Sequence, residues 1–371
     1  MQIIAKTFEG LENTVANEIK ELGGENINIV KRAVEYEGAL SLVYKSNLHL
    51  RSAIKVLINI AQFSANDEYE LYEKAKKIPW FDFIGLNQTF AIDSNVNSEF
   101  FKHSKYVAYK VKDAIADKFT EIRGRRPNVN VYNPDVRINI RIFQNNVDIS
   151  LDSSGDPLHI RGYKIDNLYA PLNEVLAAGI LLNTDFNQKD SFYDPMCGSG
   201  TLLTEAMMIN TNYAPNIHRE SFGFMTWHDF DNKLWKSILN NAKESITKPS
   251  IHFFGSDIDR KAVFATKKNL TILNFGNDID VKQADFFKIK NCSDFKFIIM
   301  NPPYDVRLQT EDIIGFYKNI GDKLKKDCTG IEAWVFSANL EALKLLGLKP
   351  DSKTKLMNGK LPAELRKYSL Y

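Results

Sequence analysis

The first 63 residues alternate between short apolar runs typical of strands and stretches with the 3.6-residue period of amphipathic helices. One such helix is expected to end at Gly23 and Gly24, because glycine commonly terminates helices. The order strand, helix, strand, strand, helix, strand predicts a ferredoxin-like unit over residues 1–63. The expected strands are residues 2–8, 26–38, 41–46 and 56–63, and the expected helices are residues 11–23 and 47–55.

A second α+β unit is expected over residues 64–155, because the pattern changes there to long elements. A helix over 104–124 is predicted to turn Tyr106, Tyr109, Val111, Ile115 and Phe119 toward a core. Residues 153–166 contain serine, glycine and proline without an apolar period, so a linker is placed over 156–168. The other expected elements are a helix over 67–78 and strands over 89–96, 136–144 and 146–152.

Beyond the linker, strands alternate with helices, which predicts a parallel sheet covered on both faces in a domain over 169–371. A hairpin around Asn358 and Gly359 is expected at one edge of that sheet. The fold class is therefore α/β, preceded by an α+β region. The predicted strands are 191–195, 250–257, 279–287, 296–304 and 332–339, and the predicted helices are 201–209, 260–270 and 311–327.

Composition narrows the class of protein. The 371 residues are 44% hydrophobic and 25% charged, with a net charge of +2, which is typical of a folded globular protein. No apolar run approaches the roughly 20 residues of a membrane helix. With no leader-like start, a cytoplasmic protein without a membrane partner is expected. Three distant cysteines predict thiols, and neither they nor the histidines have the spacing of a metal site.

Charge is concentrated in one segment. Residues 102–141 contain ten basic and four acidic residues, so a phosphate-rich partner is expected to dock there. A solvated helix face is the alternative interpretation. The arginines of this segment favour a nucleic acid as the partner, because the geometry of a guanidinium group matches that of phosphate oxygens. The candidate RNA-binding residues are Lys102, Lys105, Arg123, Arg125, Arg126 and Arg137.

A glycine loop follows the strand that ends at Asp194. Gly198 and Gly200 permit positive φ and close approach of a ligand, and the next helix directs its amides toward the loop. The spacing is neither that of a dinucleotide fingerprint nor that of a Walker loop. A structural turn is the alternative for this motif taken alone.

Three later strand ends also carry polar groups. Asp257 is placed to accept hydrogen bonds from ribose hydroxyls. Asp285 and Phe286 are placed to hold an adenine, although Phe286 alone would more often be a core residue. After the fourth strand, Asn301 precedes Pro302, Pro303 and Tyr304. The Asn301 side chain and the Pro302 carbonyl are placed to accept hydrogen bonds from a planar exocyclic amine, on whose base Tyr304 would stack.

The motifs DPMCGSGT, GSDID, AD and NPPY, in this order, resemble those of class I S-adenosylmethionine (SAM)-dependent methyltransferases that act on exocyclic amines. Residues 160–371 are similar to the large-subunit (23S) ribosomal RNA guanine-N2 methyltransferases, in a form with one methyltransferase domain. The shared features are RGY, APL, DPMCGSGTLL, FGF with Trp227, NPPY followed by RL, and the closing NG. The first half resembles the ferredoxin-like and THUMP RNA-binding region of that family.

The resemblance implies a Rossmann-like, mostly parallel seven-stranded sheet with an antiparallel edge hairpin. It implies SAM as methyl donor, S-adenosylhomocysteine (SAH) as product, and RNA as partner of a monomer or weak dimer. Asn301, Pro302, Pro303 and Tyr304 would form the catalytic site. The implied cofactor-binding residues are Asp194, Met196, Cys197, Gly198, Gly200, Asp257, Ile258, Asp285, Phe286, Ala170, Pro171, Leu172 and Asn301.

Two positions depart from the family pattern: Asp305-Val306 follows NPPY, and Asn173 replaces a lysine after APL. Three alternatives stay open. A transfer RNA guanine methyltransferase would use the same layout, and a DNA adenine methyltransferase would also use NPPY. A non-catalytic RNA-binding assembly factor would keep the fold without the reaction.

Overall fold

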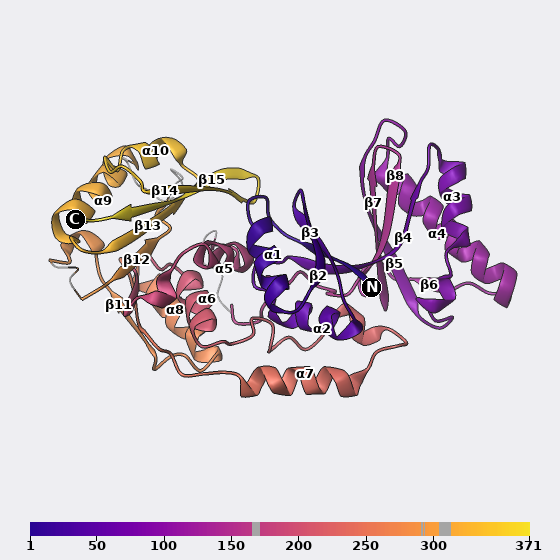
Figure 1. Cartoon of the computed structure of the whole chain (residues 1–371), viewed down its shortest axis with the longest axis horizontal. Coiled ribbons are helices and arrows are strands. Elements are labelled where there is room, and N and C mark those ends of the chain that lie inside the picture. Colours follow the sequence, from indigo (N-terminus) through magenta and orange to yellow (C-terminus); the bar gives the residue numbers. More distant parts are fainter. Residues whose placement is uncertain (165–170, 291, 293, 304–312) are drawn as a thin grey trace.

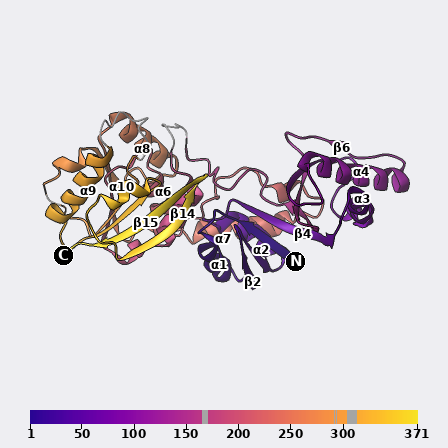
Figure 2. The ribbon, with the colours of Figure 1, turned by 90° about the horizontal axis from the view of Figure 1, so that it is seen from above.

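The computed structural model describes residues 1–164, 171–290, 292, 294–303 and 313–371. Three units lie in a row (Figures 1 and 2). The N-terminal unit occupies the middle, with the second unit on one side and the C-terminal α/β domain on the other. This arrangement separates the basic helix α4 from the end of the α/β sheet that carries the sequence motifs.

The N-terminal unit has the predicted ferredoxin-like order. Its elements are β1 (Gln2–Lys6), α1 (Glu12–Glu21), β2 (Glu25–Val30), β3 (Ala33–Glu37), α2 (Leu40–His49) and β4 (Lys55–Ser64). The prediction of a strand over 41–46 was wrong, because these residues belong to α2. The strand that the fold needs comes from the segment before it, which folds into the hairpin β2–β3.

The second unit continues the same sheet. It comprises α3 (Glu68–Lys77), β5 (Thr89–Asn97), α4 (Ser104–Arg123), β6 (Asn128–Val129), β7 (Val136–Phe143) and β8 (Asn146–Asp152). Because β4 pairs with β1 along its first half and with β8 along most of its length, both units share one eight-stranded sheet. The strand order is β2-β3-β1-β4-β8-β7-β5-β6.

Helix α4 corrects the prediction of its core face. Val111, Ile115 and Phe119 are buried as expected, but Tyr106 and Tyr109 are 45% and 57% exposed. Val107 takes their place in the buried stripe, because positions 107, 111 and 115 follow one another at the four-residue interval that keeps side chains on one helix face.

The C-terminal domain has the predicted mixed sheet, with the order β11-β10-β9-β12-β13-β15-β14. The pairs among β11, β10, β9, β12 and β13 are parallel, whereas β15 and the edge strand β14 are antiparallel. The expected Rossmann-like fold with an edge hairpin is therefore confirmed. Its elements are α5 (Glu174–Leu182), β9 (Ser191–Asp194), α6 (Thr201–Asn210), α7 (Asn232–Glu244), β10 (His252–Asp257), α8 (Arg260–Ile272), β11 (Ile279–Gln283), β12 (Phe297–Met300), α9 (Ile313–Asp327), β13 (Glu332–Ser337), α10 (Leu340–Lys344), β14 (Ser352–Asn358) and β15 (Leu361–Ser369).

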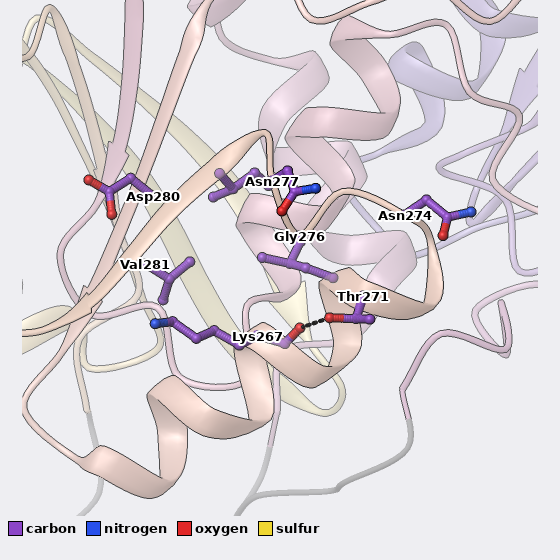
Figure 3. Close-up of a pocket in the computed structure, with 9 residues that line it drawn as sticks. Lys267, Thr271, Asn274, Gly276, Asn277, Asp280 and Val281 are labelled. Carbon is purple, nitrogen blue, oxygen red and sulfur yellow. Dashed lines mark hydrogen bonds between the residues drawn. The ribbon is translucent and has the colours of Figure 1, made fainter.

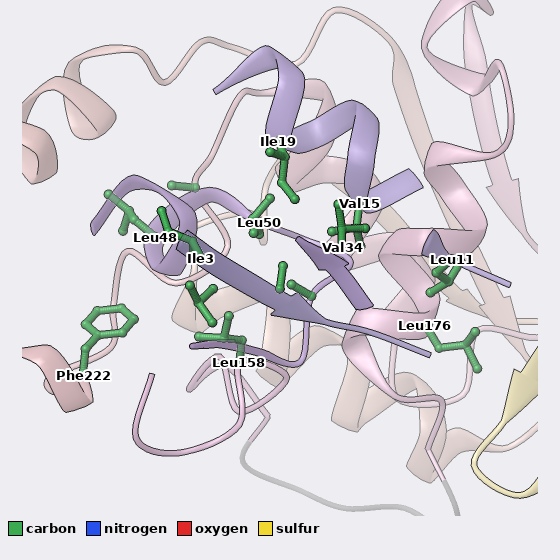
Figure 4. Packing of buried hydrophobic residues seen from close by; sticks show 14 of the residues in the cluster. Ile3, Leu11, Val15, Ile19, Val34, Leu48, Leu50, Leu158, Leu176 and Phe222 are labelled. Atoms are coloured by element: carbon green, nitrogen blue, oxygen red, sulfur yellow. The ribbon is translucent and has the colours of Figure 1, made fainter. Parts of the chain in front are cut away.

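The ferredoxin-like unit and the α/β domain share one hydrophobic core. Figure 4 shows Leu11 beside Leu176 of α5, and Phe222 near the end of α2. A Cβ atom at Gly179 would lie 2.5 Å from a methyl group of Leu11, so α5 packs closely on this unit. Tyr44 of α2 also stacks on Phe224, with ring centroids 4.3 Å apart. The two units are therefore packed into one body.

The cysteines differ from the sequence prediction. Cys292 and Cys328 form a disulfide with Cα atoms 4.9 Å apart, so the expectation of three thiols holds only for Cys197. The 36-residue separation gave no signal of this pairing, which arises because Cys292 precedes β12 and Cys328 follows the helix α9 packed beside it. Within the described ranges, no helix is long and apolar enough to cross a membrane.

Candidate cofactor and base site

The four sequence motifs meet at one edge of the α/β sheet. Strands β11, β10, β9 and β12 are neighbours and run parallel, so their carboxyl ends lie together. Asp194 and Asp257 end β9 and β10, and Asn301 follows β12 directly. Asp285 lies two residues after the end of β11. This edge is where open α/β sheets bind ligands.

The glycine loop lies against α8. Gly198 and Gly200 have φ values of +56° and +79°. A Cβ at Gly200 would lie 2.6 Å from Cγ2 of Thr266, whereas a Cβ at Gly198 would meet no atom within 4 Å. Gly200 is therefore required for packing and backbone conformation, and Gly198 faces open space that a ligand can approach. The Thr266 hydroxyl donates to the Gly198 carbonyl at 2.8 Å and fixes the loop.

Two carboxylates line this loop. Asp257 accepts hydrogen bonds from the Gly198 and Asp259 amides, both at 2.9 Å. Asp194 is buried and accepts one from the Met196 amide at 3.2 Å. Burial, reinforced by the negative charge of Asp257, raises the pKa of Asp194 to about 8. A positively charged ligand would stabilise both carboxylates, because it offsets their desolvation and mutual repulsion.

The other predicted cofactor residues divide by exposure. Ile258 is 67% exposed beside Asp257, whereas Phe286 is buried in the core. Asp285 caps the short helix η4 (Phe286–Lys288) through the Phe287 amide at 3.0 Å. Burial raises the pKa of the Cys197 thiol, and its sulfur lies 3.7 Å from the Thr266 hydroxyl. Cys197 is therefore held as a packed thiol rather than as a thiolate.

Asn301 carries an unusual oxygen. Its side-chain Oδ1 is buried and has no hydrogen-bond partner within the described structure. Buried acceptors are normally satisfied, so an oxygen without a partner among the described residues at this edge is a candidate contact for a ligand. Pro302 and Pro303 follow it and have no amide hydrogens to satisfy this oxygen. Tyr304 and the departure at Asp305-Val306 lie outside the described residues.

Lys164 contacts the segment before α5, because its ammonium group donates to the Leu172 carbonyl at 2.8 Å. Pro171 and Leu172 are described, whereas Ala170 is outside the described residues. Asn173 caps α5, because its Oδ1 accepts from the Val175 and Leu176 amides at 3.0 and 3.3 Å. This position therefore has a structural role where the family pattern has a lysine.

Sequence reasoning missed a buried ion pair on α6, the helix that follows the glycine loop. Arg161 and Glu205 are fully buried and lie 2.8 Å apart, and the Tyr163 hydroxyl donates to Glu205 at 3.0 Å. Arg161 also donates to the Arg51 carbonyl at 2.6 Å, so the pair joins α6 to the N-terminal unit. The available signal was a lone carboxylate inside the apolar helix TLLTEAMMI, which requires a buried partner.

The structure does not place all predicted RNA-binding residues on one surface. Lys102, Lys105, Arg123, Arg125 and Arg126 are exposed on α4 and its flanking residues. Arg137 alternates with the buried Val136 and Ile138 on β7 and therefore lies on the opposite sheet face from α4. Its guanidinium group forms an ion pair with Asp93 at 3.1 Å.

A pocket of about 550 Å³ lies between the end of α8 and the start of β11 (Figure 3). It is lined by polar groups such as Asn274, Asn277 and Asp280. Because it lies at the amino end of β11, it is at the opposite sheet edge from the sequence motifs. In the part of the chain that the structure describes, no group of three or more histidine, cysteine or acidic residues is arranged to hold a metal ion.

Comparisons with known proteins agree with this architecture. Residues 161–367 match the RMKL-like methyltransferase domain, residues 65–152 the THUMP domain, and residues 2–57 the RlmL ferredoxin-like domain. A putative RNA methyltransferase of Synechocystis sp. is 37% identical over 99% of this chain and 96% of its own length. The ribosomal RNA large subunit methyltransferase K/L of Vibrio campbellii is 34% identical over the whole chain, which spans 53% of that relative.

Two crystal structures match over the whole chain and 98% of their own. SMU.472, a putative methyltransferase complexed with SAH, is 26% identical with a TM-score of 0.90. A possible methylase from Clostridium difficile is 31% identical with a TM-score of 0.92. The expected fold and the expected cofactor, SAM, are confirmed. The chain therefore belongs to the RMKL-like methyltransferase family, and with its THUMP domain it is a SAM-dependent RNA methyltransferase.

Proposed function

We propose that this protein methylates the exocyclic N2 amine of a guanine in large-subunit ribosomal RNA. The observation that carries the proposal is the buried Oδ1 of Asn301 at the carboxyl end of β12, which has no partner among the described residues. An amine with two N–H groups supplies the donor that this oxygen lacks. The Pro302 carbonyl is the second proposed acceptor, and Tyr304 is proposed to stack on the base.

The residues present fit the cofactor. We propose that Gly198 gives it close access to the backbone of a loop whose conformation Gly200 permits. We also propose that Asp194 attracts its positive charge and that Asp257 accepts hydrogen bonds from its ribose. Met196, Cys197, Ile258, Asp285 and Phe286 complete the proposed binding site, with Ala170, Pro171 and Leu172 closing over the methionine end. When bound, SAM supplies an electrophilic methyl group and leaves as SAH.

The residues after β12 are proposed to act by positioning and polarisation. The lone pair of a guanine N2 is delocalised into the ring, so it must be localised before it attacks a methyl group. Acceptors at Asn301 and Pro302 favour this change if their geometry matches the developing tetrahedral nitrogen better than the planar amine. One N–H proton is lost to solvent after the N–C bond forms, which restores a neutral amine.

The choice of ribosomal RNA is supported by the Vibrio relative, and RNA as the partner is supported by the THUMP domain and its exposed arginines and lysines. We propose that Lys102, Lys105, Arg123, Arg125 and Arg126 contact RNA phosphates on the side of α4. Arg137 would contribute from the opposite sheet face. We also propose the domain division 1–63, 64–155, linker 156–168 and 169–371, with β4 as the strand shared by the first two domains.

The direct test is to incubate the full chain with methyl-labelled SAM and, separately, unmodified ribosomal RNA and transfer RNA, followed by nucleoside analysis. N2-methylguanosine in the large-subunit RNA is the expected result. The same nucleoside confined to transfer RNA would replace the proposed substrate, and N6-methyladenosine would replace the proposed base. Labelled SAM bound without transfer to either RNA or to ribosomal particles would support a non-catalytic assembly factor.

A further inference from the structure

The outer face of α4 carries two tyrosines that the sequence pattern had assigned to the core. We define this outer face as Lys102, which lies two residues before the helix, with Lys105, Tyr106, Tyr109 and Lys110. The buried stripe runs through Val107, Val111, Ile115 and Phe119, and Tyr106 and Tyr109 project from the other side of the helix. Within the described structure, neither tyrosine hydroxyl has a hydrogen-bond partner.

The neighbouring helix α3 does not cover these rings. It reaches α4 near the carboxyl-terminal half, where the Tyr72 hydroxyl donates to Asp117 at 2.7 Å and Lys76 pairs with Glu121. Tyr106 and Tyr109 lie in the amino-terminal half and remain exposed. Large exposed aromatic side chains indicate a binding surface when the charged groups beside them are complementary to one kind of partner.

The charge around the rings suits a polyanion. Residues 100–112 contain four lysines and no carboxylate, and the carboxylates that flank this segment are Glu99 and Asp113. The ammonium groups of Lys110 and Lys112 lie 5.4 and 5.6 Å from the ring centroids of Tyr106 and Tyr109, and Lys112 also forms an ion pair with Asp113 at 3.0 Å. The first turn of α4 contains no acidic residue, so the positive end of the helix dipole is not offset there. A cation therefore accompanies each stacking surface.

We infer that the outer face of α4 binds an unpaired RNA segment by stacking bases on Tyr106 and Tyr109 while the lysines contact its phosphates. Exposed aromatic rings interleaved with cations bind single strands, because unpaired bases offer free π-faces that a duplex keeps within its stack. The inference rests on the proposed RNA substrate and makes it more specific. The target guanine would lie in an RNA that also presents a single-stranded segment at α4.

The chain contains a matched control on the adjacent helix. Tyr69 is 72% exposed in the first turn of α3, between Glu68 and Glu70. It resembles Tyr106 and Tyr109 in exposure but lies in an acidic environment that repels phosphate. A loss of RNA binding specific to the outer face of α4 therefore distinguishes a local stacking role from a general effect of removing a surface tyrosine.

The test measures binding of the full chain to a fluorescent single strand of about 12 nucleotides and to the same strand within a hairpin duplex. We expect Tyr106→Ala and Tyr109→Ala each to weaken single-strand binding about five- to tenfold and duplex binding less than about twofold. Tyr106→Phe, Tyr109→Phe and Tyr69→Ala should bind the single strand like the wild type, because they keep the stacking ring or lie outside the face.

Wild-type single-strand affinity in both alanine variants would overturn the inference. An equal loss for single strand and duplex would overturn it as well, because stacking on unpaired bases predicts a selective loss. Nucleoside analysis keeps the two proposals separate. Selective single-strand binding by Tyr106 and Tyr109 without N2-methylguanosine in any RNA would remove the proposed reaction alone, and methylation that is insensitive to both alanine changes would remove the stacking role alone.

Discussion

The methyltransferase end of the molecule and the outer face of α4 hold their polar groups in opposite ways. Around the glycine loop, Asp194, Glu205 and the Asn301 oxygen are buried. On the outer face of α4, Lys105, Tyr106 and Tyr109 are exposed, and Lys110 is half-exposed. Because the groups at the first site are buried, substituting any one of them should cost a large free energy. Because the groups on α4 are exposed, substitutions there should have small effects on stability that add up independently.

The two regions therefore contribute differently to binding: the buried site selects the geometry of its ligand, and the exposed face supplies general attraction for a polyanion. A buried acceptor or ion pair selects one ligand geometry, because an unsatisfied group away from water costs free energy. An exposed basic and aromatic face binds many sequences and responds strongly to salt. Five predictions test the contrast, beginning with the largest expected effect.

Glu205→Gln should have the largest effect. It leaves the Arg161 charge buried without its ion-pair partner, and we expect the free energy of unfolding in urea to fall by about 3–5 kcal/mol. Glu341→Gln is the matched control, because Glu341 and Lys344 also form a pair at 2.7 Å but lie on the surface. That control should change stability by less than about 0.5 kcal/mol. Equal stability of both variants would contradict the contrast.

Asn301→Ala should lower kcat about 100-fold or more, because it removes the proposed acceptor at the reacting amine. SAM affinity, measured by calorimetry, should stay within about twofold, since the change leaves the glycine loop and its carboxylates intact. Asn277→Ala, at the pocket on the opposite sheet edge, is the control and should keep wild-type turnover. Normal methylation by the Asn301 variant would exclude the proposed mechanism.

Cofactor affinity should rise with pH. Because the pKa of Asp194 is about 8, its ionised fraction, and hence its attraction for the positively charged cofactor, increases about tenfold between pH 7 and pH 9. The ratio of wild-type to Asp194→Asn affinity removes the titration of the ligand itself. That ratio should rise over this window. A ratio independent of pH would show that Asp194 does not titrate against the cofactor.

The raised pKa of Asp194 has the opposite effect on the stability of the cofactor-free protein, which should fall as pH rises. The folded state keeps a proton on Asp194 that the unfolded state releases at its ordinary pKa of 3.8. This group's contribution to the free energy of unfolding therefore falls as pH rises from about 4 to about 8. Asp194→Asn should reduce that slope in urea denaturation measured across the same pH range.

Arg126→Ala should have the smallest effect, about a threefold loss of RNA affinity near 0.15 M salt, with the salt slope reduced by about one. Arg126 is exposed beyond the end of α4. Arg137→Ala should change affinity less than about twofold, because its guanidinium group is paired with Asp93 on the other sheet face. Filter-binding titrations at several salt concentrations measure both. A larger loss for Arg137 would move the RNA path to that face.

Most elements and the order of the motifs were predictable, because periodicity and strand-end residues are local properties. The strand predicted over 41–46 failed because a short apolar run fits either a strand or a helix, and packing against Phe224 selects the helix. The prediction that Tyr106 and Tyr109 of α4 face the core failed for a related reason. Aromatic residues favour cores on average, but their angular position on the helix decides exposure.

The sequence by itself determined the ferredoxin-like order of the first unit, the α/β alternation of the last, and the polar residues at four strand ends. Only the tertiary structure showed that β4 joins two units into one sheet, that Arg161 meets Glu205, and that the Asn301 oxygen has no partner in the described part of the chain. The physical reason is distance along the chain. Local periodicity indicates which residues can be buried. Strand pairing, the hydrogen-bond partners of buried polar groups, and the exposure of each side chain depend on segments far apart in sequence that meet only in the fold.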